Sequence, residues 1–234
     1  MKSAVIKRVS ETHAMIYLGD TIAPERASLI GSLSEKIRLE FAAGIIEVVP
    51  SYTSIMIEFN LLKMPYSTLE ARLTELLVCF KQSSQQKQQK IIELPVYYHP
   101  DVAPDLQTLA EAKNLSVQQV IDIHCQSDYT VCTIGFSPGF AFLGSVDQRI
   151  VMPRHASPRL KIPAGSVGIA DRQTAVYPDD SPGGWQIIGN CPITLFNPER
   201  DPMMSFSVGD KVRFKSVSLE EFTQQGGQIC PNWK

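Results

Sequence analysis

The fold of this chain is decided by GFSPGFAFLG (residues 135–144) and by PRHASPRLKIPAGSVGIADRQTAVYPDDSPGGWQIIGNCPITLFNP (residues 153–198). Eight of the 16 prolines fall within residues 153–202, and eight of the 14 glycines fall within residues 135–189. Proline fixes φ and removes a backbone donor, and glycine permits positive φ, so this density excludes helices. Because these residues alternate with Val, Ile, Tyr and Phe, the stretch predicts short strands joined by tight turns.

Strand patterns recur at short intervals through the second half of the chain. They are Tyr129–Ile134, Ser166–Ile169, Ala175–Tyr177, Trp185–Ile188, Ile193–Phe196 and Lys211–Phe214. Many short strands separated by Gly/Pro turns indicate a β-sandwich or a closed barrel, and the pattern alone does not separate the two.

The first 95 residues alternate strand and helix patterns instead. The strand patterns are Ala4–Val9, Ala14–Leu18, Ile45–Val49, Ser54–Phe59 and Ile91–Val96, and the helical spacings run over Pro24–Glu40 and Leu69–Phe80. With Ile91–Val96 as its last strand, this order predicts a split-βαβ (ferredoxin-like) domain with one extra N-terminal strand.

The run KQSSQQKQQK (residues 81–90) is polar and lacks an apolar face. Apolar strand patterns lie on both sides of it, so we place a domain boundary near this run. The predicted fold class is α+β, with an N-terminal domain over residues 1–86 and a C-terminal domain over residues 87–234.

A pair of short helices is predicted between Pro104 and Gln126, with Ser116 and Gln119 suited to cap the second helix. The pair resembles a helix-turn-helix DNA-binding motif. Its second helix contains no Lys or Arg, however, and phosphate contacts supply much of the affinity in that class. We interpret the pair as a helical cover over the C-terminal strands.

Composition narrows the functional class further. A chain of 234 residues with 44% hydrophobic residues can fill one large or two small cores. The formal net charge of -2, without a long basic run, argues against binding to nucleic acid or to a membrane surface. The N-terminus has no signal-peptide pattern and the sequence has no apolar run long enough to span a membrane, so we expect a soluble, cytoplasmic protein.

Cysteine and histidine spacing predicts no metal site. The five cysteines form no CxxC pair, and the four histidines form no HExxH motif. Reduced thiols are the expected state of these cysteines.

The glycine- and proline-rich stretch also resembles a known family. GFSPGFAFLG matches the family's GFxPGFxFLG, and PRHASPR, IPAGSVGIA, QTAVYP, SPGGWQIIG and LFNP follow in the family's order. IIELPVYY, PDL, VIDIH and VGDKVRF extend the resemblance more weakly to most of the chain. The family is that of the 5-oxoprolinase B subunit, also described as allophanate hydrolase subunit 1 or as the Kip inhibitor of a sporulation histidine kinase. Membership implies a cyclophilin-like β-barrel for the C-terminal domain.

The resemblance implies a subunit of an ATP-dependent 5-oxoprolinase, which opens 5-oxo-L-proline to L-glutamate together with the A and C subunits. Because GxxxxGK[ST] is absent, ATP is expected to bind in the complex rather than to this chain alone. The chain is therefore expected to be inactive by itself. Two alternatives stay open: a regulatory inhibitor of a histidine kinase, and one part of a biotin-dependent urea carboxylase or allophanate-processing enzyme.

Arg154 and Arg159 lie in a loop too rich in proline to be helical, and the planar fork of each matches a carboxylate or a phosphate. Surface ion pairs are the alternative, but the resemblance places both arginines in a family motif. We therefore predict that they bind substrate.

Further candidates for substrate binding follow on the next strands. Ser166 ends a PAGS turn that can present backbone N–H groups to an oxyanion; the alternative is a hairpin that needs glycine for its geometry. Gln173 and Tyr177 share one strand face and offer an amide and a phenol to a lactam; the alternative is that Tyr177 is a half-buried core residue and Gln173 bonds a loop. Trp185 can lie at the rim of a pocket. The pocket wall is predicted from Phe136, Phe140, Phe142, Gly183 and Gly184.

The catalytic base is not identified by any motif. No Ser-His-Asp grouping can be assembled from residue order, and GxSxG is absent. His124, at the end of a helical pattern, is the candidate acid or base, and a structural hydrogen bond is the alternative role.

Overall fold

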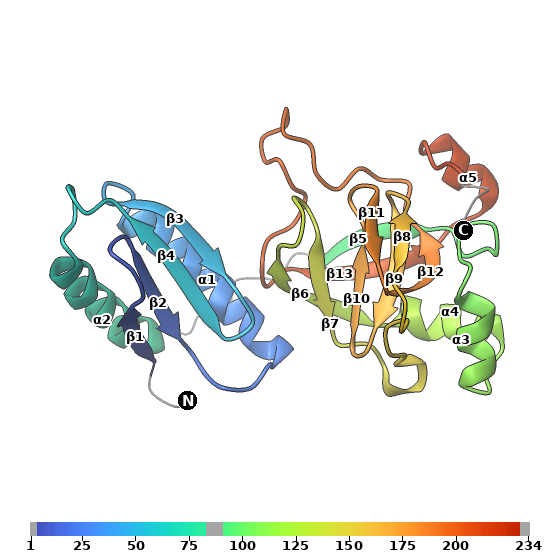
Figure 1. Ribbon diagram of the computed structural model, residues 1–234, viewed down its shortest axis with the longest axis horizontal. Coiled ribbons are helices and arrows are strands. Elements are labelled where there is room, and N and C mark those ends of the chain that lie inside the picture. The colour runs from blue at the N-terminus through green and yellow to red at the C-terminus, as the bar shows by residue number, and fades with distance from the viewer. Residues whose placement is uncertain (1–3, 83–90, 230–234) are drawn as a thin grey trace. The chain divides into compact units, whose positions relative to one another are not determined.

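The structure is a computed structural model that describes residues 4–82 and 91–229 (Figure 1). The chain divides into two compact units, Met1–Gln89 and Lys90–Lys234. The predicted boundary between residues 86 and 87, like most of the polar run 81–90, lies outside the described residues. No helix in the described ranges is both long enough and apolar enough to cross a membrane.

The N-terminal unit is a four-stranded antiparallel sheet with two helices. The strand order is β1-β2-β4-β3, and all neighbouring pairs are antiparallel. Helix α1 packs against β3 and β4, and α2 packs against β1 (Figure 1). The elements are β1 (Val5–Arg8), β2 (His13–Tyr17), α1 (Pro24–Glu40), β3 (Ile45–Pro50), β4 (Ser54–Phe59) and α2 (Tyr66–Gln82).

Alternation along β2 and β4 fills the core of this unit. Every second residue of each strand points to the same face, and the buried set is Ala14, Ile16, Ile55, Ile57 and Phe59. Both helices cover this face of the sheet with the apolar residues whose spacing predicts a helix. These residues are Ile30, Leu33 and Ile37 in α1 and Leu69 and Leu73 in α2, and all are fully buried.

The prediction that Ile91–Val96 completes the N-terminal sheet is wrong. This strand is β5, and it pairs in parallel with β13 (Lys211–Ser216) in the second unit. In the N-terminal sheet, β2 already lies between β1 and β4. The extra N-terminal strand therefore takes the edge position beside β2, and no place next to β2 remains for β5.

The C-terminal unit is a nearly closed seven-stranded barrel. Its strand order is β12-β9-β10-β7-β6-β13-β5. The two edge strands meet where the backbones of Tyr97, just after β5, and Asn190, at the end of β12, exchange hydrogen bonds of 2.8 and 3.0 Å. The remaining barrel strands are β6 (Asp128–Ile134), β7 (Ala141–Gly144), β9 (Ser166–Ala170), β10 (Gln173–Val176) and β12 (Gln186–Asn190). The predicted α+β class with a C-terminal barrel is confirmed.

Helices cover part of the barrel. Helix α3 (Leu106–Ala112) packs against β12, and α4 (Val117–Gln126) packs against β13 and α3 (Figure 1). The predicted capping box is present: the Ser116 hydroxyl accepts from the backbone of Gln119, and the Gln119 side chain accepts from the backbone of Ser116. A short C-terminal helix, α5 (Leu219–Gln224), is anchored by buried Phe222, whose ring stacks on Tyr97.

Strand prediction is incomplete around the proline-rich loops. The sequence patterns do not include β7, β8 (Arg159–Ile162) or β11 (Ser181–Gly183); β8 and β11 form a separate two-stranded ribbon. The predicted strand Ile193–Phe196 is wrong, because only Phe196 pairs, in an isolated bridge with Met204. The segment lies between Pro192 and Pro198, which restrict the backbone and remove donors.

Candidate functional site

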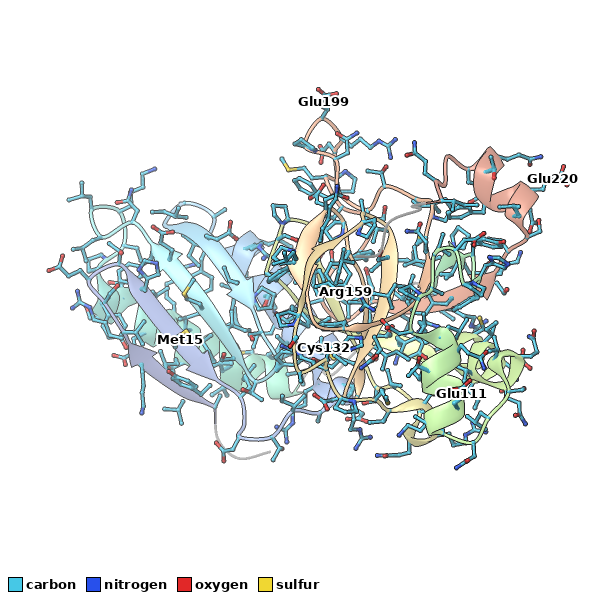
Figure 2. The ribbon with its side chains drawn as sticks, turned by 45° about the vertical axis from the view of Figure 1, so that its right-hand side comes forward. Met15, Glu111, Cys132, Arg159, Glu199 and Glu220 are labelled. Atoms are coloured by element: carbon cyan, nitrogen blue, oxygen red, sulfur yellow. The ribbon has the colours of Figure 1, made fainter. Side chains whose placement is uncertain are left out.

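Four segments of the C-terminal unit, most of them loops, lie against one another around Gly139 and Gly184. They are residues 135–140, 153–158, 178–184, which include β11, and 196–206. A Cβ added to Gly139, whose φ is +82°, would lie 2.5 Å from the Phe196 Cβ and 3.4 Å from the Pro178 Cβ. Only glycine fits this contact, so the GFSPGF motif brings the loops together. In Figure 2 the last of these loops projects outward, with Glu199 near its tip.

Three buried aromatic rings fill the barrel beneath these loops. Phe140, Tyr177 and Trp185 are 2%, 1% and 4% exposed. The Phe140 ring meets Tyr177 at 5.2 Å and Trp185 at 5.7 Å, both edge to face. Half-buried Phe142 packs against Phe140 at 4.9 Å, whereas Phe136 is 66% exposed and touches the cluster through Phe140. Phe140 and Phe142 therefore belong to one packed aromatic cluster and Phe136 lies at its exposed edge, while their role as a pocket wall stays a prediction.

The Tyr177 hydroxyl is held against the backbone of the SPGG loop. A Cβ on Gly183 would lie 2.4 Å from this hydroxyl oxygen, so a side chain here would displace the phenol. Burial raises the pKa of Tyr177 to about 12, although Arg154, Arg159 and a backbone hydrogen bond from Trp185 each favour the ionised form. The phenol is therefore protonated at neutral pH and remains a hydrogen-bond donor.

The two predicted arginines are in different situations. Arg154 is exposed, and its guanidinium carbon lies 5.7 Å from the centre of the Trp185 ring, a cation–π distance. Arg159 instead forms a bidentate ion pair with Asp105: Nη1 donates to Oδ2 at 2.9 Å, and Nη2 donates to Oδ1 at 2.7 Å (Figure 2 labels Arg159). The fork of Arg159 is thus occupied by the protein's own carboxylate, whereas that of Arg154 lies over Trp185 and forms no ion pair with the residues that the structure describes.

Asp105 is a buried residue that sequence reasoning does not select. It is 5% exposed and precedes α3. Its Oδ2 also accepts from the backbone N–H of Ile187 at 2.6 Å, and its own N–H donates to the Ile187 carbonyl at 3.0 Å. Asp105 therefore joins the start of α3 to β8 and to β12.

His155 is a second residue that the sequence does not single out. Its side chain is 31% exposed, and its Nε2 lies 3.2 Å from Oδ1 of Asp105. Its backbone N–H donates to the Gly184 carbonyl at 2.7 Å, which ties the PRHASP loop to the SPGG loop. No sequence signal marks the contact with Asp105, because the two residues lie far apart along the chain and in no shared motif.

The turn at residues 163–166 does not form an oxyanion site. Its N–H groups are bonded within the chain: Ala164 to Asp180 Oδ1, Gly165 to the Tyr177 carbonyl, and Ser166 to the Pro163 carbonyl. That interpretation of the turn is wrong, because no N–H of these three residues is left for an anion. Ser166 itself is fully buried, and its Oγ has no hydrogen-bond partner among the described residues.

Gln173 and Tyr177 share a face of β10 but are not neighbours. Gln173 pairs in register with Gly144 and Ala170 at the start of the strand, and Tyr177 follows its end. Four residues of extended strand separate the two Cα atoms by about 13 Å, so Gln173 and Tyr177 stand at opposite ends of the strand, and their joint role in binding a ligand stays a prediction.

His124 is sealed in the core on the other side of β10. It is 0% exposed and stacks on Phe214 at 4.4 Å. Nδ1 lies 2.7 Å from the Tyr98 hydroxyl, and Nε2 lies 3.0 Å from Thr174 Oγ1. Since Thr174 donates its hydroxyl proton to the Gly168 carbonyl, it accepts from Nε2–H, and Nδ1 accepts from Tyr98. Burial lowers the pKa of His124 to about 3, so the ring is neutral. These contacts favour the structural role; a catalytic role remains only a prediction.

The described residues contain no group of three or more His, Cys, Asp or Glu side chains arranged to hold a metal ion. The polar side chains that the structure places beside these loops include Arg154, His155, Asp105, Arg159 and Tyr177.

Comparison with known proteins gives a family and several relatives. Residues 4–206 match the family model described as carboxyltransferase domain, subdomain C and D. The 5-oxoprolinase B subunit of Bacillus subtilis is 35% identical over 227 residues, covering 93% of this chain and 94% of that protein.

Solved structures show the same fold. The crystal structure of TTHA0988 matches with a TM-score of 0.75 and 28% identity over 88% of this chain, which spans only 40% of that longer chain. The urea carboxylase of Kluyveromyces lactis matches with a TM-score of 0.66 over 95% of this chain and 23% of its own. At 18% identity, this second likeness shows the fold alone.

Proposed function

This chain belongs to the family of 5-oxoprolinase B subunits, and we propose that it acts as the B subunit of an ATP-dependent 5-oxoprolinase that converts 5-oxo-L-proline to L-glutamate. The observation that carries the proposal is the 35% identity to the Bacillus subtilis protein along 93% of this chain and 94% of that relative. Similarity over nearly the full length of both chains favours a shared role more than a shared motif would.

The chemistry requires help from other groups. A five-membered lactam is a poor electrophile, and phosphorylation of its amide oxygen by ATP activates the carbonyl carbon. Because this sequence contains no GxxxxGK[ST] loop, we place ATP on a partner chain, the A or the C subunit. The part left to this chain is to bind and orient the substrate.

Arg154 and Trp185 are the residues that we propose for substrate binding. The Arg154 fork matches the carboxylate of 5-oxoproline, and the Trp185 ring beneath it limits the orientations of the guanidinium. Tyr177 lies buried below, beside Gly183, and supports this arrangement. Ser166 offers a hydroxyl without a partner among the described residues of the same barrel, which a polar ligand group or a rearranged neighbour would satisfy.

Reconstitution tests the function. The purified chain, the A and C subunits, and all three together are each assayed for glutamate formation from 5-oxoproline with and without ATP. We expect turnover only in the ternary mixture with ATP. Turnover by this chain alone contradicts the shared site, and a ternary mixture that forms no glutamate contradicts the proposed reaction.

A second candidate is a part in biotin-dependent carboxyl transfer. It is favoured by the match of residues 4–206 to a carboxyltransferase subdomain model. In that case a reconstituted complex would hydrolyse ATP in response to urea and bicarbonate, and avidin would block it. The same preparation distinguishes the two functions by which substrate stimulates ATP hydrolysis.

A further inference from the structure

The four histidines of the chain have very different surroundings. His13 lies in the N-terminal unit, on β2. His99 is exposed and lies 3.2 Å from Asp101. His124 is fully buried, and both of its ring nitrogens are hydrogen-bonded, to Tyr98 and to Thr174. His155 belongs to the loop that carries Arg154, and its backbone N–H donates to the carbonyl of Gly184.

The Nε2 atom of His155 faces the interior. It is buried and lies 3.2 Å from Asp105 Oδ1, and the described residues give this nitrogen no aligned hydrogen bond. The carboxylate beside it is itself fixed by Arg159 and by the backbone of Ile187. Catalytic hydrogen bonds are often long or poorly aligned before substrate binds, and they tighten in the complex.

We propose that His155 is the proton-transfer residue of this site, with Asp105 as the residue that positions its ring. The inference rests on the proposed function. A carboxylate beside Nε2 favours the tautomer that carries its proton there, which leaves Nδ1 as the basic nitrogen. Because 31% of the His155 side chain is exposed, the ring is open to solvent and to a bound substrate.

His155 would accept and return one proton while the activated lactam ring is opened by water. Nδ1 of His155 takes a proton from the attacking water while the water oxygen bonds to the carbonyl carbon. The ring C–N bond then breaks, the nitrogen keeps the electron pair and takes the proton back from His155, and the new hydroxyl group loses its proton to solvent, which leaves an acyl phosphate. A second water cleaves the acyl phosphate to the carboxylate of glutamate and inorganic phosphate. ATP is the co-reactant that activates the carbonyl group.

The charged groups around His155 come from three places. Asp105 precedes α3, Arg159 belongs to β8 and shares Oδ1 of Asp105 with His155, and Arg154 precedes His155 in its own loop. Asp105 and Arg159 neutralise each other, so His155 lies beside a fixed ion pair rather than beside an isolated charge.

The test uses His155→Gln in the reconstituted complex, because glutamine keeps a polar side chain but takes up no proton. We expect kcat to fall about 100-fold, because a general acid–base group typically contributes at least that factor to the rate. KM should change by less than about threefold. The acidic limb of the wild-type kcat profile against pH should also disappear. A purely structural role for His155 would lower the amount of folded complex but leave the shape of that profile intact.

His99→Gln is the matched control. His99 Nδ1 also lies 3.2 Å from a carboxylate oxygen, of Asp101, but both side chains are about half exposed and belong to no loop of the site. The His99→Gln complex should keep the wild-type kcat and pH profile.

A second readout does not depend on activity. Two-bond ¹H–¹⁵N spectra of the full chain, assigned with His155→Gln, should show the neutral His155 ring protonated at Nε2. A proton on Nδ1 overturns the proposal. So does a His155→Gln complex with wild-type kcat and pH profile, which would leave the proposed function standing. A wild-type complex without turnover overturns the proposed function and this role with it.

Discussion

Asp105 and Arg159, 54 positions apart in the sequence, form a bidentate ion pair in which the carboxylate is 7% exposed and the guanidinium 21%. The backbone N–H of Ile187 donates to the same carboxylate at 2.6 Å. The pair therefore fixes three segments, the start of α3, β8 and β12, beside the loops of the candidate site. A ligand that needed the Arg159 fork would first have to displace Asp105.

Replacing Asp105 by Asn should destabilise the chain strongly. The change leaves Arg159 half-buried without its counter-charge, and breaking a buried pair in this way costs about 3–5 kcal/mol. The free energy of unfolding in urea measures the effect.

Asp128→Asn supplies the comparison for that measurement. Asp128 and Arg213 also form a bidentate pair, through Nε at 2.6 Å and Nη2 at 2.9 Å, but with side chains 36% and 42% exposed. Exposed pairs contribute less than about 1 kcal/mol, so this variant should unfold nearly as the wild type does. Equal losses in the two variants would contradict the special role of Asp105.

The sequence predicts the elements of the fold better than their pairing. Apolar periodicity identifies both helices of the first unit and most barrel strands, because each pattern reports the burial of one face. It places β5 in the wrong sheet, since an alternating strand pattern does not state its neighbour, and the partner β13 begins at residue 211. β8 and β11 are missed because proline and glycine obscure the pattern in short edge ribbons.

The site is predictable only where family motifs mark its residues. The family motifs identify Trp185, Phe140 and Arg154, which do lie together. Asp105 and His155 are missed because their contact joins distant segments, and no residue pattern marks a long-range ion pair. Gln173 and Tyr177 show a different limit of the sequence, because sharing a strand face does not make two side chains neighbours.

His124 should make the fold sensitive to mild acid. Its pKa is lowered to about 3 by burial, whereas an unfolded histidine titrates near 6.5. Above pH 6.5 neither state binds the proton. Between pH 6.5 and about pH 3 only the unfolded state binds it, so the free energy of unfolding decreases as the pH is lowered. From pH 7 to pH 5 this group should remove about 2 kcal/mol. Urea unfolding of His124→Gln at both pH values should show a correspondingly smaller difference; an unchanged difference would contradict the assignment.

Gly183→Ala should disturb the site through Tyr177. The added Cβ would lie 2.4 Å from the Tyr177 hydroxyl and 2.9 Å from an Ile162 methyl group, both well inside contact distance. Overpacking of this kind costs about 1–3 kcal/mol, and it should lower both the melting temperature and the activity of the complex. Gly135→Ala is the control, because a Cβ there meets nothing within 4 Å. Similar melting temperatures for the two variants would show that the SPGG loop simply moves aside.

Lysine substitutions should separate the two arginines that the sequence treats as one anion-binding pair. Arg154→Lys keeps the charge but loses the planar fork over Trp185, so kcat/KM of the complex should fall at least about tenfold, or roughly 1.4 kcal/mol, with an unchanged melting temperature. Arg159→Lys should instead lower the melting temperature, because one ammonium group does not replace two parallel hydrogen bonds to buried Asp105. Calorimetry and steady-state kinetics on the same preparations check both effects. Full activity in Arg154→Lys would show that the Arg154 fork does not bind substrate. An unshifted melting temperature in Arg159→Lys would mean that Asp105 is held by its backbone contact with Ile187 alone.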